Sequence, residues 1–262
     1  DGYDVKTEQG TSGTLIDPEQ TASVLAVAAS GASRRGILPV VEGADPEVTT
    51  DELEALDVRH LVSQFTTYHD CCQNRVTNIH LMADKVDGAI VEPGATFDLN
   101  EYVGRRTTED GYLEDGTIEQ GEIVKSVGGG VSQFATTFYN AVFWGGYEDV
   151  THRPHSFYFS RYPEGIEATI SWPAPDIRFS NNGDSAILIK TEYTDTSITV
   201  QFYSNNDDRV FVGSHRNGKT SVEVARDGGP NARKVSFTRS ARSAPTAPGV
   251  QYRANPEVPP GP

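Results

Sequence analysis

Three consecutive glycines, Gly128, Gly129 and Gly130, stand just before Ser132 in the stretch "VGGGVSQFATTFYNAVF". Glycines let the backbone approach a bound group closely, and the first turn of the helix predicted to follow offers free N–H groups to a negative charge. A serine in this place is a candidate nucleophile for acyl transfer or amide hydrolysis. The same residues also fit a tight structural corner in which Ser132 caps its own helix.

His155 and Asp176 complete the candidate catalytic set, each at the start of a predicted strand. A nucleophile at a helix start, then a histidine base, then an acidic residue that orients it, is the chain order of papain-like and transglutaminase-like enzymes. Those enzymes use a thiol, whereas a serine hydroxyl needs a stronger base and an oxyanion hole. Here the N–H groups near Val131 to Gln133 would supply that hole. The alternative is that His155 is a hydrogen-bonded residue without a catalytic role.

Arginines supply the candidate ligand-binding groups. A guanidinium offers paired donors that hold a carboxylate or phosphate, although on an acidic protein it also serves internal ion pairs. The candidates for a ligand-binding surface at the glycine run are Gly128, Gly129, Gly130, Gln133, Arg75, Arg105 and Arg161. Tyr158, Tyr162 and Trp172 are candidates for an aromatic sugar platform, and equally for half-buried strand positions.

Phosphate and metal chemistry find weaker support in the sequence. The stretch "GGGVSQ" lacks the lysine of a P-loop and the spacing of a dinucleotide-binding motif. His152 and His155, with His69 or His80 as a further donor, match no zinc signature. We therefore expect neither a metal site nor a cofactor.

The composition limits the partners that this chain can have. Its formal net charge of −15 argues against nucleic acid or an anionic membrane as partner, because an acidic surface is repelled by both. No apolar run reaches the ~18 to 20 residues that a membrane span needs. Because the sequence starts without Met and without a signal segment, we expect a processing or truncation point at residue 1 and leave an upstream anchor open.

The only two cysteines, Cys71 and Cys72, are adjacent. Neighbouring Cα atoms lie ~3.8 Å apart, less than the ~4.4 to 6.8 Å that a disulfide usually spans. Two thiols, a vicinal disulfide and an intermolecular bridge therefore all stay open. The scarcity of Cys and Met indicates an oxidising or exported setting.

The elements that must position these residues are both helices and strands. With 25 Gly and 15 Pro the chain has many turns. We expect an α+β fold: a mixed or antiparallel sheet with a central helix following the glycine-rich turn, and a mainly β C-terminal half. The central helix carries apolar residues at helical spacing over 131–142 and ends at Gly145-Gly146.

Further helix signals come from capping residues. Asp17 is the predicted N-cap of a helix that Gly31 ends, and Thr49 with Glu52 forms a capping box for a short helix. A third helix is predicted over 76–86. Residues 104–120 are expected to form a surface loop or hairpin.

Strands are predicted from alternating apolar residues between turn signals. They cover the first part of residues 58–88, two short runs around the Pro-Gly turn at 93–94, then "SFYFSRYP", "IEATISW", "AILIKTEY" and "SITVQFYS", and more weakly "RVFVGSH" and "ARKVSFTRS".

The ordered motifs "FTTYHDCCQNRVTNIHLMADKVDGAIVEPGATFDLNEYVG", "VGGGVSQFATTFYNAVFWGG" and "HRPHSFYFSRYPEGIEATISWPAPDIRFSN" resemble the VanW-like domain family over about residues 62–205. Residues 1–60 resemble the end of the peptidoglycan-binding α/β module that often precedes such domains. We therefore expect a module end at 1–60, a VanW-like domain at 61–205, a β-rich extension at 206–243 and a Pro-rich tail at 244–262.

The resemblance implies a secreted or membrane-anchored cell-envelope protein of a Gram-positive bacterium, in a family associated with glycopeptide resistance. The glycine-serine form followed by "QFATT" is similar to the actinobacterial branch. Many relatives carry a cysteine at the position of Ser132, so the serine weakens the case for a thiol-type mechanism.

Two functions from different classes are consistent with the sequence. In the first, the protein binds peptidoglycan or a wall precursor stem peptide in a cleft at the glycine run and the Ser132 helix start. In the second, it is an acyl-transfer or amide-hydrolysing enzyme on wall peptide that uses Ser132, His155 and Asp176. Both place the protein outside the cell or in its envelope, where an upstream segment would anchor it, and we favour the first.

Overall fold

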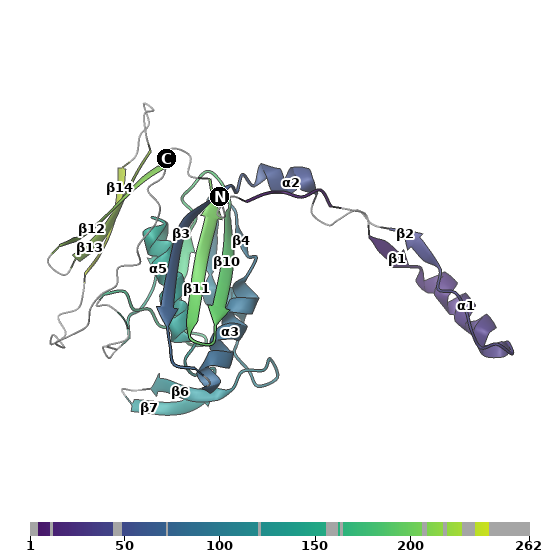
Figure 1. Cartoon of the computed structure of the whole chain (residues 1–262). Helices are drawn as coiled ribbons and strands as arrows, with labels where there is room; N and C mark the ends of the chain where they lie inside the picture. The colour runs from purple at the N-terminus through teal and green to yellow at the C-terminus, as the bar shows by residue number, and fades with distance from the viewer. Residues whose placement is uncertain are drawn as a thin grey trace. The chain divides into compact units, whose positions relative to one another are not determined.

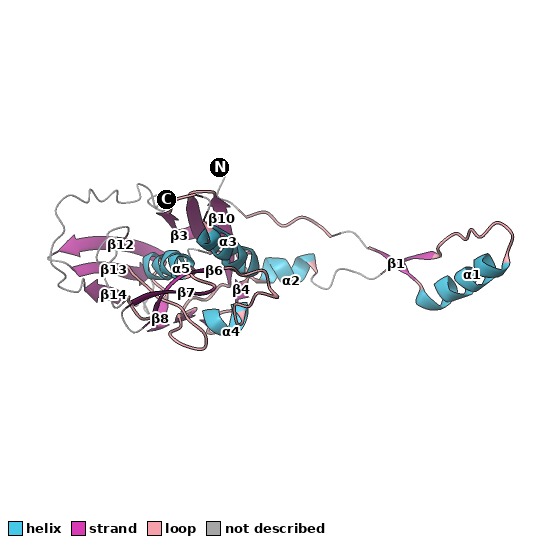
Figure 2. Ribbon diagram, turned by 90° about the horizontal axis from the view of Figure 1, so that it is seen from below, coloured by secondary structure: helices cyan, strands magenta, loops and turns pink. Residues whose placement is uncertain are grey.

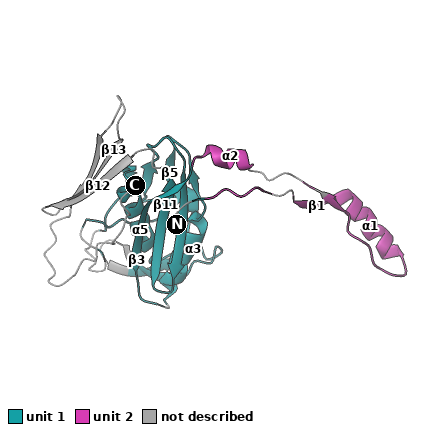
Figure 3. Cartoon of the chain, turned by 45° about the horizontal axis from the view of Figure 1, so that its top comes forward, with its two compact units in different colours: residues 1–5, 58–262 teal, residues 6–57 magenta. Residues whose placement is uncertain are grey.

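The computed structural model of the chain describes residues 5–10, 13–43, 49–71, 73–119, 122–155, 162, 165–205, 209–216, 219–226 and 234–240. The chain divides into two compact units (Figure 3). The smaller unit is residues 6–57, and the larger unit is residues 1–5 with 58–262. All candidate site residues belong to the larger unit.

The smaller unit consists of two short strands and two helices. They are β1 (Thr14–Ile16), α1 (Pro18–Ser30), β2 (Val40–Glu42) and α2 (Thr50–Ala55). As the sequence predicts, Asp17 caps α1, accepting the N–H groups of Glu19 and Gln20, and Thr49 with Glu52 forms the capping box of α2. Neither helix contains a buried residue, so capping rather than packing defines these helices.

The larger unit is built on a four-stranded antiparallel sheet in the order β3-β11-β10-β4 (Figure 1). These strands are β3 (His60–Tyr68), β4 (Ile90–Val91), β10 (Ile187–Thr194) and β11 (Ser197–Ser204). Alternate residues of β11, Ile198, Val200 and Phe202, are fully buried. This period of two gives the sheet one apolar face that helices must cover.

Helices α3 (Asn74–Val86) and α5 (Ser132–Trp144) cover that face (Figure 1). Residues 133–143 of α5 are all buried, so α5 is the central helix that the sequence predicts. It ends where predicted, with the N–H of Gly145 bonded to the carbonyl of Ala141.

A second sheet closes the core from another side, in the order β5-β9-β8. Its strands are β5 (Thr96–Asp98), β8 (Glu148–Thr151) and β9 (Arg178–Ser180), and α4 (Leu99–Val103) directly follows β5. Phe97 and Phe179 from this sheet pack against Phe138 of α5 and Phe202 of β11. Because all four rings are buried, this aromatic cluster joins both sheets and the central helix into one core.

The remaining strands of the larger unit form one hairpin and a small three-stranded sheet (Figure 2). They are β6 (Glu114–Glu119) with β7 (Glu122–Val127), and β12 (Arg209–Arg216), β13 (Lys219–Arg226) and β14 (Lys234–Ser240). The expected α+β class, with a C-terminal part rich in strands, is therefore confirmed, and part of the 104–120 region forms one arm of a hairpin.

One predicted strand is wrong. Residues 166–172, "IEATISW", form no strand, because side chains of α5 bond the backbone of Ile166, Ala168 and Ile170 in place of a neighbouring strand. The predicted strand at 156–163 lies outside the described residues except for Tyr162.

Candidate functional site

The glycine run packs against three other segments of the same chain. A Cβ on Gly128 would come within 2.9 Å of the Arg106 side chain, and one on Gly130 within 2.5 Å of Arg75. A Cβ on Gly129 would overlap the backbone of Asp115 in β6. Gly128 and Gly130 also have φ values of 81° and 89°, a conformation that favours glycine. Each glycine is therefore required by internal packing.

Asn78 of α3 anchors the glycine run through hydrogen bonds. Its side chain is fully buried and donates to the carbonyls of Gly129 and Leu113, both at 2.9 Å, while its oxygen accepts the N–H of Leu113 at 2.8 Å. The sequence pattern gave no sign of this residue, because a polar side chain on a helix face is usually solvated.

Most backbone N–H groups of the run are used within the chain. Gly128 donates to Leu113 at 3.0 Å and Gly129 to Ser126 at 3.1 Å. The N–H groups of Val131 and Gln133 donate to the carbonyls of Gly128 and Gly130 at 3.4 and 3.1 Å. Two donors of the expected oxyanion hole thus have acceptors already.

Ser132 is the first residue of α5, and the N-cap is Val131, so the capping hypothesis for Ser132 is wrong. Ser132, Thr136 and Asn140, four residues apart on one stripe of α5, instead bond to the extended segment 166–170. The contacts are Ser132 Oγ with the N–H of Ile170 (3.3 Å), Thr136 Oγ1 with the N–H and C=O of Ala168 (3.2 and 2.9 Å), and Asn140 Nδ2 with the C=O of Ile166 (2.9 Å). We call these three residues the polar ladder.

The polar ladder can form because the spacing of every fourth helix residue matches the spacing of every second residue in the segment 166–170. Four residues of α-helix rise about 6 Å, and two residues of extended chain rise about 6.6 Å. Every fourth helix residue therefore meets every second residue of 166–170. Ser132 Oγ is the outermost rung, on a partly exposed residue, whereas Thr136 and Asn140 are fully buried.

Arg75 is held against the other side of the first turn of α5. Its Nη2 donates to Gln133 Oε1 at 2.7 Å, and Gln133 Nε2 donates to the carbonyl of Tyr68 at 2.9 Å. The backbone N–H of Arg75 donates to Asp115 Oδ2 at 2.8 Å. Asp115 of β6 thereby caps α3, whose own N-cap residue, Gln73, makes no side-chain hydrogen bond. The structure thus brings together three of the candidate ligand-binding residues, Arg75, Gly130 and Gln133.

His155 lies next to a carboxylate that the sequence did not single out. Its Nδ1 is 3.1 Å from Glu167 Oε2, and both side chains are nearly buried, 9% and 7% exposed. Glu167 lies on the segment that the polar ladder holds. Because it occurs in a run that reads as an ordinary strand, no local signal marked it as the acidic partner of His155.

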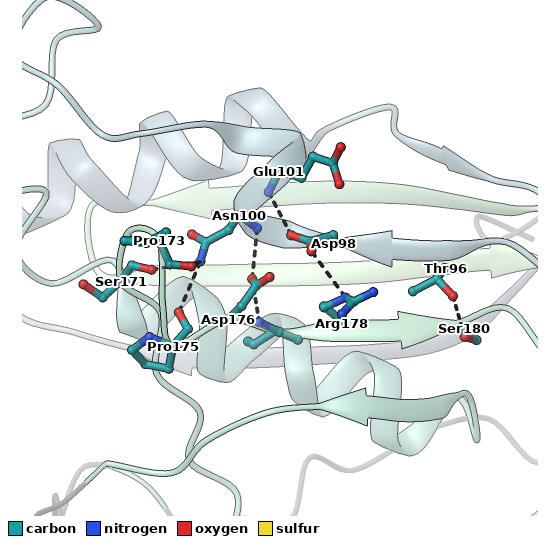
Figure 4. Close-up of polar contacts among 11 residues, drawn as sticks. Thr96, Asp98, Asn100, Glu101, Ser171, Pro173, Pro175, Asp176, Arg178 and Ser180 are labelled. Atoms are coloured by element: carbon teal, nitrogen blue, oxygen red, sulfur yellow. Dashed lines mark hydrogen bonds and ion pairs between the residues drawn. The ribbon is translucent and has the colours of Figure 1, made fainter.

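Asp176, the expected orienter of His155, has other partners (Figure 4). Its Oδ1 accepts the N–H groups of Asn100 and Ile177 at 3.0 and 2.7 Å. Burial raises the pKa of Asp176 to about 6, and so does the hydrogen bond that its protonated carboxyl donates to the neighbouring Asp98 carboxylate. Asp98 in turn pairs with Arg178, with Nε and Oδ2 3.3 Å apart.

Asn100 connects this acidic pair to the loop at residues 171–175, which we call the Trp172 loop. Its Nδ2 donates to the carbonyls of Ser171, Pro173 and Pro175 at 2.8, 3.2 and 3.2 Å (Figure 4). Arg106 Nη1 donates to Asn100 Oδ1 at 2.7 Å and orients the amide. Both residues are buried, Asn100 3% and Arg106 7% exposed.

The other candidates are spread over the surface or lie beyond the described part. Arg105 is exposed, and Arg161 and Cys72 lie outside the described residues. Cys71 is disulfide-bonded. His152 pairs with Asp149. In the described ranges no group of three or more His, Cys, Asp or Glu side chains is arranged to hold a metal, and no helix there is long and apolar enough to cross a membrane.

The sequence matches a family profile described as VanW like protein over residues 74–203. The YoaR protein of Bacillus subtilis, described as uncharacterized, is 34% identical over 161 residues, which are 62% of this chain and 53% of YoaR. The vancomycin B-type resistance protein VanW of Enterococcus faecalis is 24% identical over 170 residues, 60% of this chain and 58% of that protein. The chain thus spans a little over half the length of these relatives. No solved structure shows significant similarity to it.

Proposed function

Residues 74–203 of this chain form a VanW-like domain, and from this premise we propose that the protein is a cell-envelope protein that binds peptidoglycan or a wall precursor stem peptide. The binding surface is the first turn of α5 together with Arg75. The whole chain acts as a recognition module in this proposal.

The position of Arg75 is the observation that supports this function. A guanidinium fixed by Gln133 beside the start of a thirteen-residue helix places a full positive charge next to the positive end of the helix dipole. The first turn of α5 itself contains no acidic residue, and the nearby Asp115 carboxylate bonds the backbone N–H of Arg75. Stem peptides carry carboxylates, which are the chemical group that such a place attracts.

Recognition is favoured over catalysis because the groups that catalysis needs have other partners. Ser132 Oγ accepts the N–H of Ile170, and the N–H groups of Val131 and Gln133 donate within the first turn. A nucleophile and an oxyanion hole would both have to give up these bonds.

The proposed location in the cell envelope is supported by the disulfide and by a relative. Cys71 is disulfide-bonded, and disulfides persist in exported proteins. One of the relatives is named for vancomycin resistance, which is consistent with a role at the wall. We include in the proposal that residues 1–60 are the end of a peptidoglycan-binding module and that the protein is of the actinobacterial type.

The buried pair His155–Glu167 favours a second function, that of an acyl-transfer or amide-hydrolysing enzyme on wall peptide. Glu167, rather than Asp176, would then orient the imidazole. Ser132 Oγ would attack the peptide carbonyl and pass its proton to His155, which would return it to the leaving amine; water would release the acyl group by the same steps.

Sedimentation of the protein with purified sacculi, and titration with soluble muropeptides, test both functions. We expect Arg75→Ala to weaken binding about tenfold or more. Arg153→Ala, which removes an exposed arginine outside the proposed surface, serves as the matched control and should bind normally. Ser132→Ala is expected to bind like the wild type.

Mass spectrometry of the same incubations separates recognition from catalysis. New products with the wild type that disappear in Ser132→Ala would replace the binding proposal by the enzyme. Absence of binding by the wild type would overturn the proposal altogether.

A further inference from the structure

The Trp172 loop is exposed, yet it is held in place by two buried polar side chains. Ser171, Trp172, Pro173 and Ala174 are all exposed. The loop is closed on itself by the bond from Ser171 N–H to the Pro175 carbonyl at 2.9 Å. Below it, Asn100 bonds three of its carbonyls, as Figure 4 shows.

Burying an amide and a guanidinium carries a desolvation cost that an apolar core would avoid. Burial lowers the pKa of the Arg106 guanidinium, because the charged form loses part of its hydration. What this arrangement fixes is the conformation of a solvent-exposed loop. Fixing a surface in advance reduces the entropy lost when a ligand binds, so a rigid exposed loop indicates recognition.

The loop and α4, which Asn100 ties together, both present large aromatic side chains. Trp172 is 45% exposed and Tyr102 of α4 is 49% exposed. Trp172 is one of only two tryptophans in the chain. An exposed indole offers a flat apolar face with a polar N–H at its edge, a combination typical of binding surfaces.

The polar groups next to the loop select the ligand. Arg178, 46% exposed, can donate hydrogen bonds, and Asp98, 25% exposed, can accept them in addition to its bonds with Arg178 and the N–H of Glu101. Acceptors and a donor beside an aromatic face fit a ligand with an apolar face and a rim of hydroxyl groups. The net charge of −15 disfavours a polyanion.

We infer that the Trp172 loop, with α4, is a binding surface for the neutral sugar rings of a glycan strand, which stack on Trp172 and bond to Asp98 or Arg178. This inference rests on the proposed function and deepens it. The peptide part of the wall is bound by Arg75 and the first turn of α5, and the sugar part by a different set of residues.

The full chain titrated with chitotetraose, a neutral oligomer of N-acetylglucosamine, tests the inference. In a Trp144→Phe background Trp172 is the remaining tryptophan, so its fluorescence should shift on binding. Calorimetry should show that Trp172→Ala weakens binding about tenfold. Tyr193→Ala, another exposed aromatic, is the matched control and should leave the affinity unchanged.

Unchanged affinity in Trp172→Ala, or no binding of chitotetraose by the wild type, would overturn the inference. So would preferential binding of a proline-rich peptide to Trp172. Because Trp172 is half exposed, its loss should leave the circular dichroism and melting temperature intact; Trp172→Phe, which keeps a ring, should recover part of the affinity.

The sacculus assay keeps the two proposals distinguishable. Sacculus binding that depends on Arg75 but not on Trp172 would remove the glycan surface and leave the proposed function standing. Chitotetraose binding through Trp172 without any response to a stem pentapeptide would support the glycan surface and remove the peptide site.

Discussion

The first turn of α5 and the Trp172 loop use polar groups in opposite ways. At α5 the glycines, Ser132 and Gln133 have the types and spacing of a chemical site, but most of their hydrogen-bonding groups are bonded inside the chain. At the Trp172 loop the sequence offers only Trp172 as a candidate, and buried polar side chains hold exposed residues in place. The comparison shows that residue type predicts which hydrogen bonds a side chain can make. Whether those groups are available to a ligand depends on the neighbours that the fold places beside them.

Gly129→Ala is expected to have the largest effect, because the new Cβ would overlap the backbone of Asp115, which cannot move as a side chain can. We expect a loss of about 3 kcal/mol in the free energy of unfolding, or no folded protein. Urea denaturation measures it. Gly13→Ala, with nothing near its Cβ, should stay within about 0.5 kcal/mol of the wild type, and equal effects would contradict the packing role of the glycine run.

Asn100→Ala should come next. It removes three hydrogen bonds to the Trp172 loop and leaves the buried Arg106 donor without its amide partner. We expect about 2 to 3 kcal/mol of destabilisation. Hydrogen exchange should show faster exchange at the Ser171 amide, and normal protection there would mean that Asn100 does not hold the loop.

The polar ladder should show a gradient from its buried to its exposed end. Thr136→Val keeps the shape but leaves the N–H and C=O of Ala168 without this partner, at a cost of about 1 to 3 kcal/mol. Ser132→Ala loses a single 3.3 Å bond at a partly exposed position and should cost less than about 1 kcal/mol. Thermal melts compare them, and a larger cost for Ser132→Ala would reverse the gradient.

Asp176 should give an effect that appears only as a pH dependence of the free energy of unfolding. Its pKa is about 6 when folded, above the ordinary value of 3.8, so between these values the folded state binds more protons than the unfolded state. Stability from this group is therefore fully present below pH 3.8 and is lost as pH rises through 6.

Asp176→Asn, which retains an acceptor oxygen for Asn100, should be more stable than the wild type at pH 7 and nearly equal at pH 4. Urea denaturation at both pH values checks this. A variant that is less stable at pH 7 would show that the charged form of Asp176 supports the fold through Arg178 or Arg106.

Local signals predicted the elements well where capping and periodicity agree. Asp17, the Thr49–Glu52 box and the Gly145 stop all act as expected, since each depends on residues within a few positions. The strand predicted at 166–172 failed because its partner is a helix face rather than another strand. Alternating residues look alike in both surroundings.

The site could be predicted only as a set of residue types. The sequence by itself determined the α+β class, the central helix and the place of Ser132 and Gln133 directly after a glycine corner, because these follow from local conformation and composition. The tertiary structure decided that Arg75 lies beside them. The pairing of His155 with Glu167, of Asp176 with Asn100, and the anchoring of the Trp172 loop were decided by the tertiary structure. A buried polar group bonds to whichever partner the fold places within about 3 Å, and separation along the chain does not determine that distance.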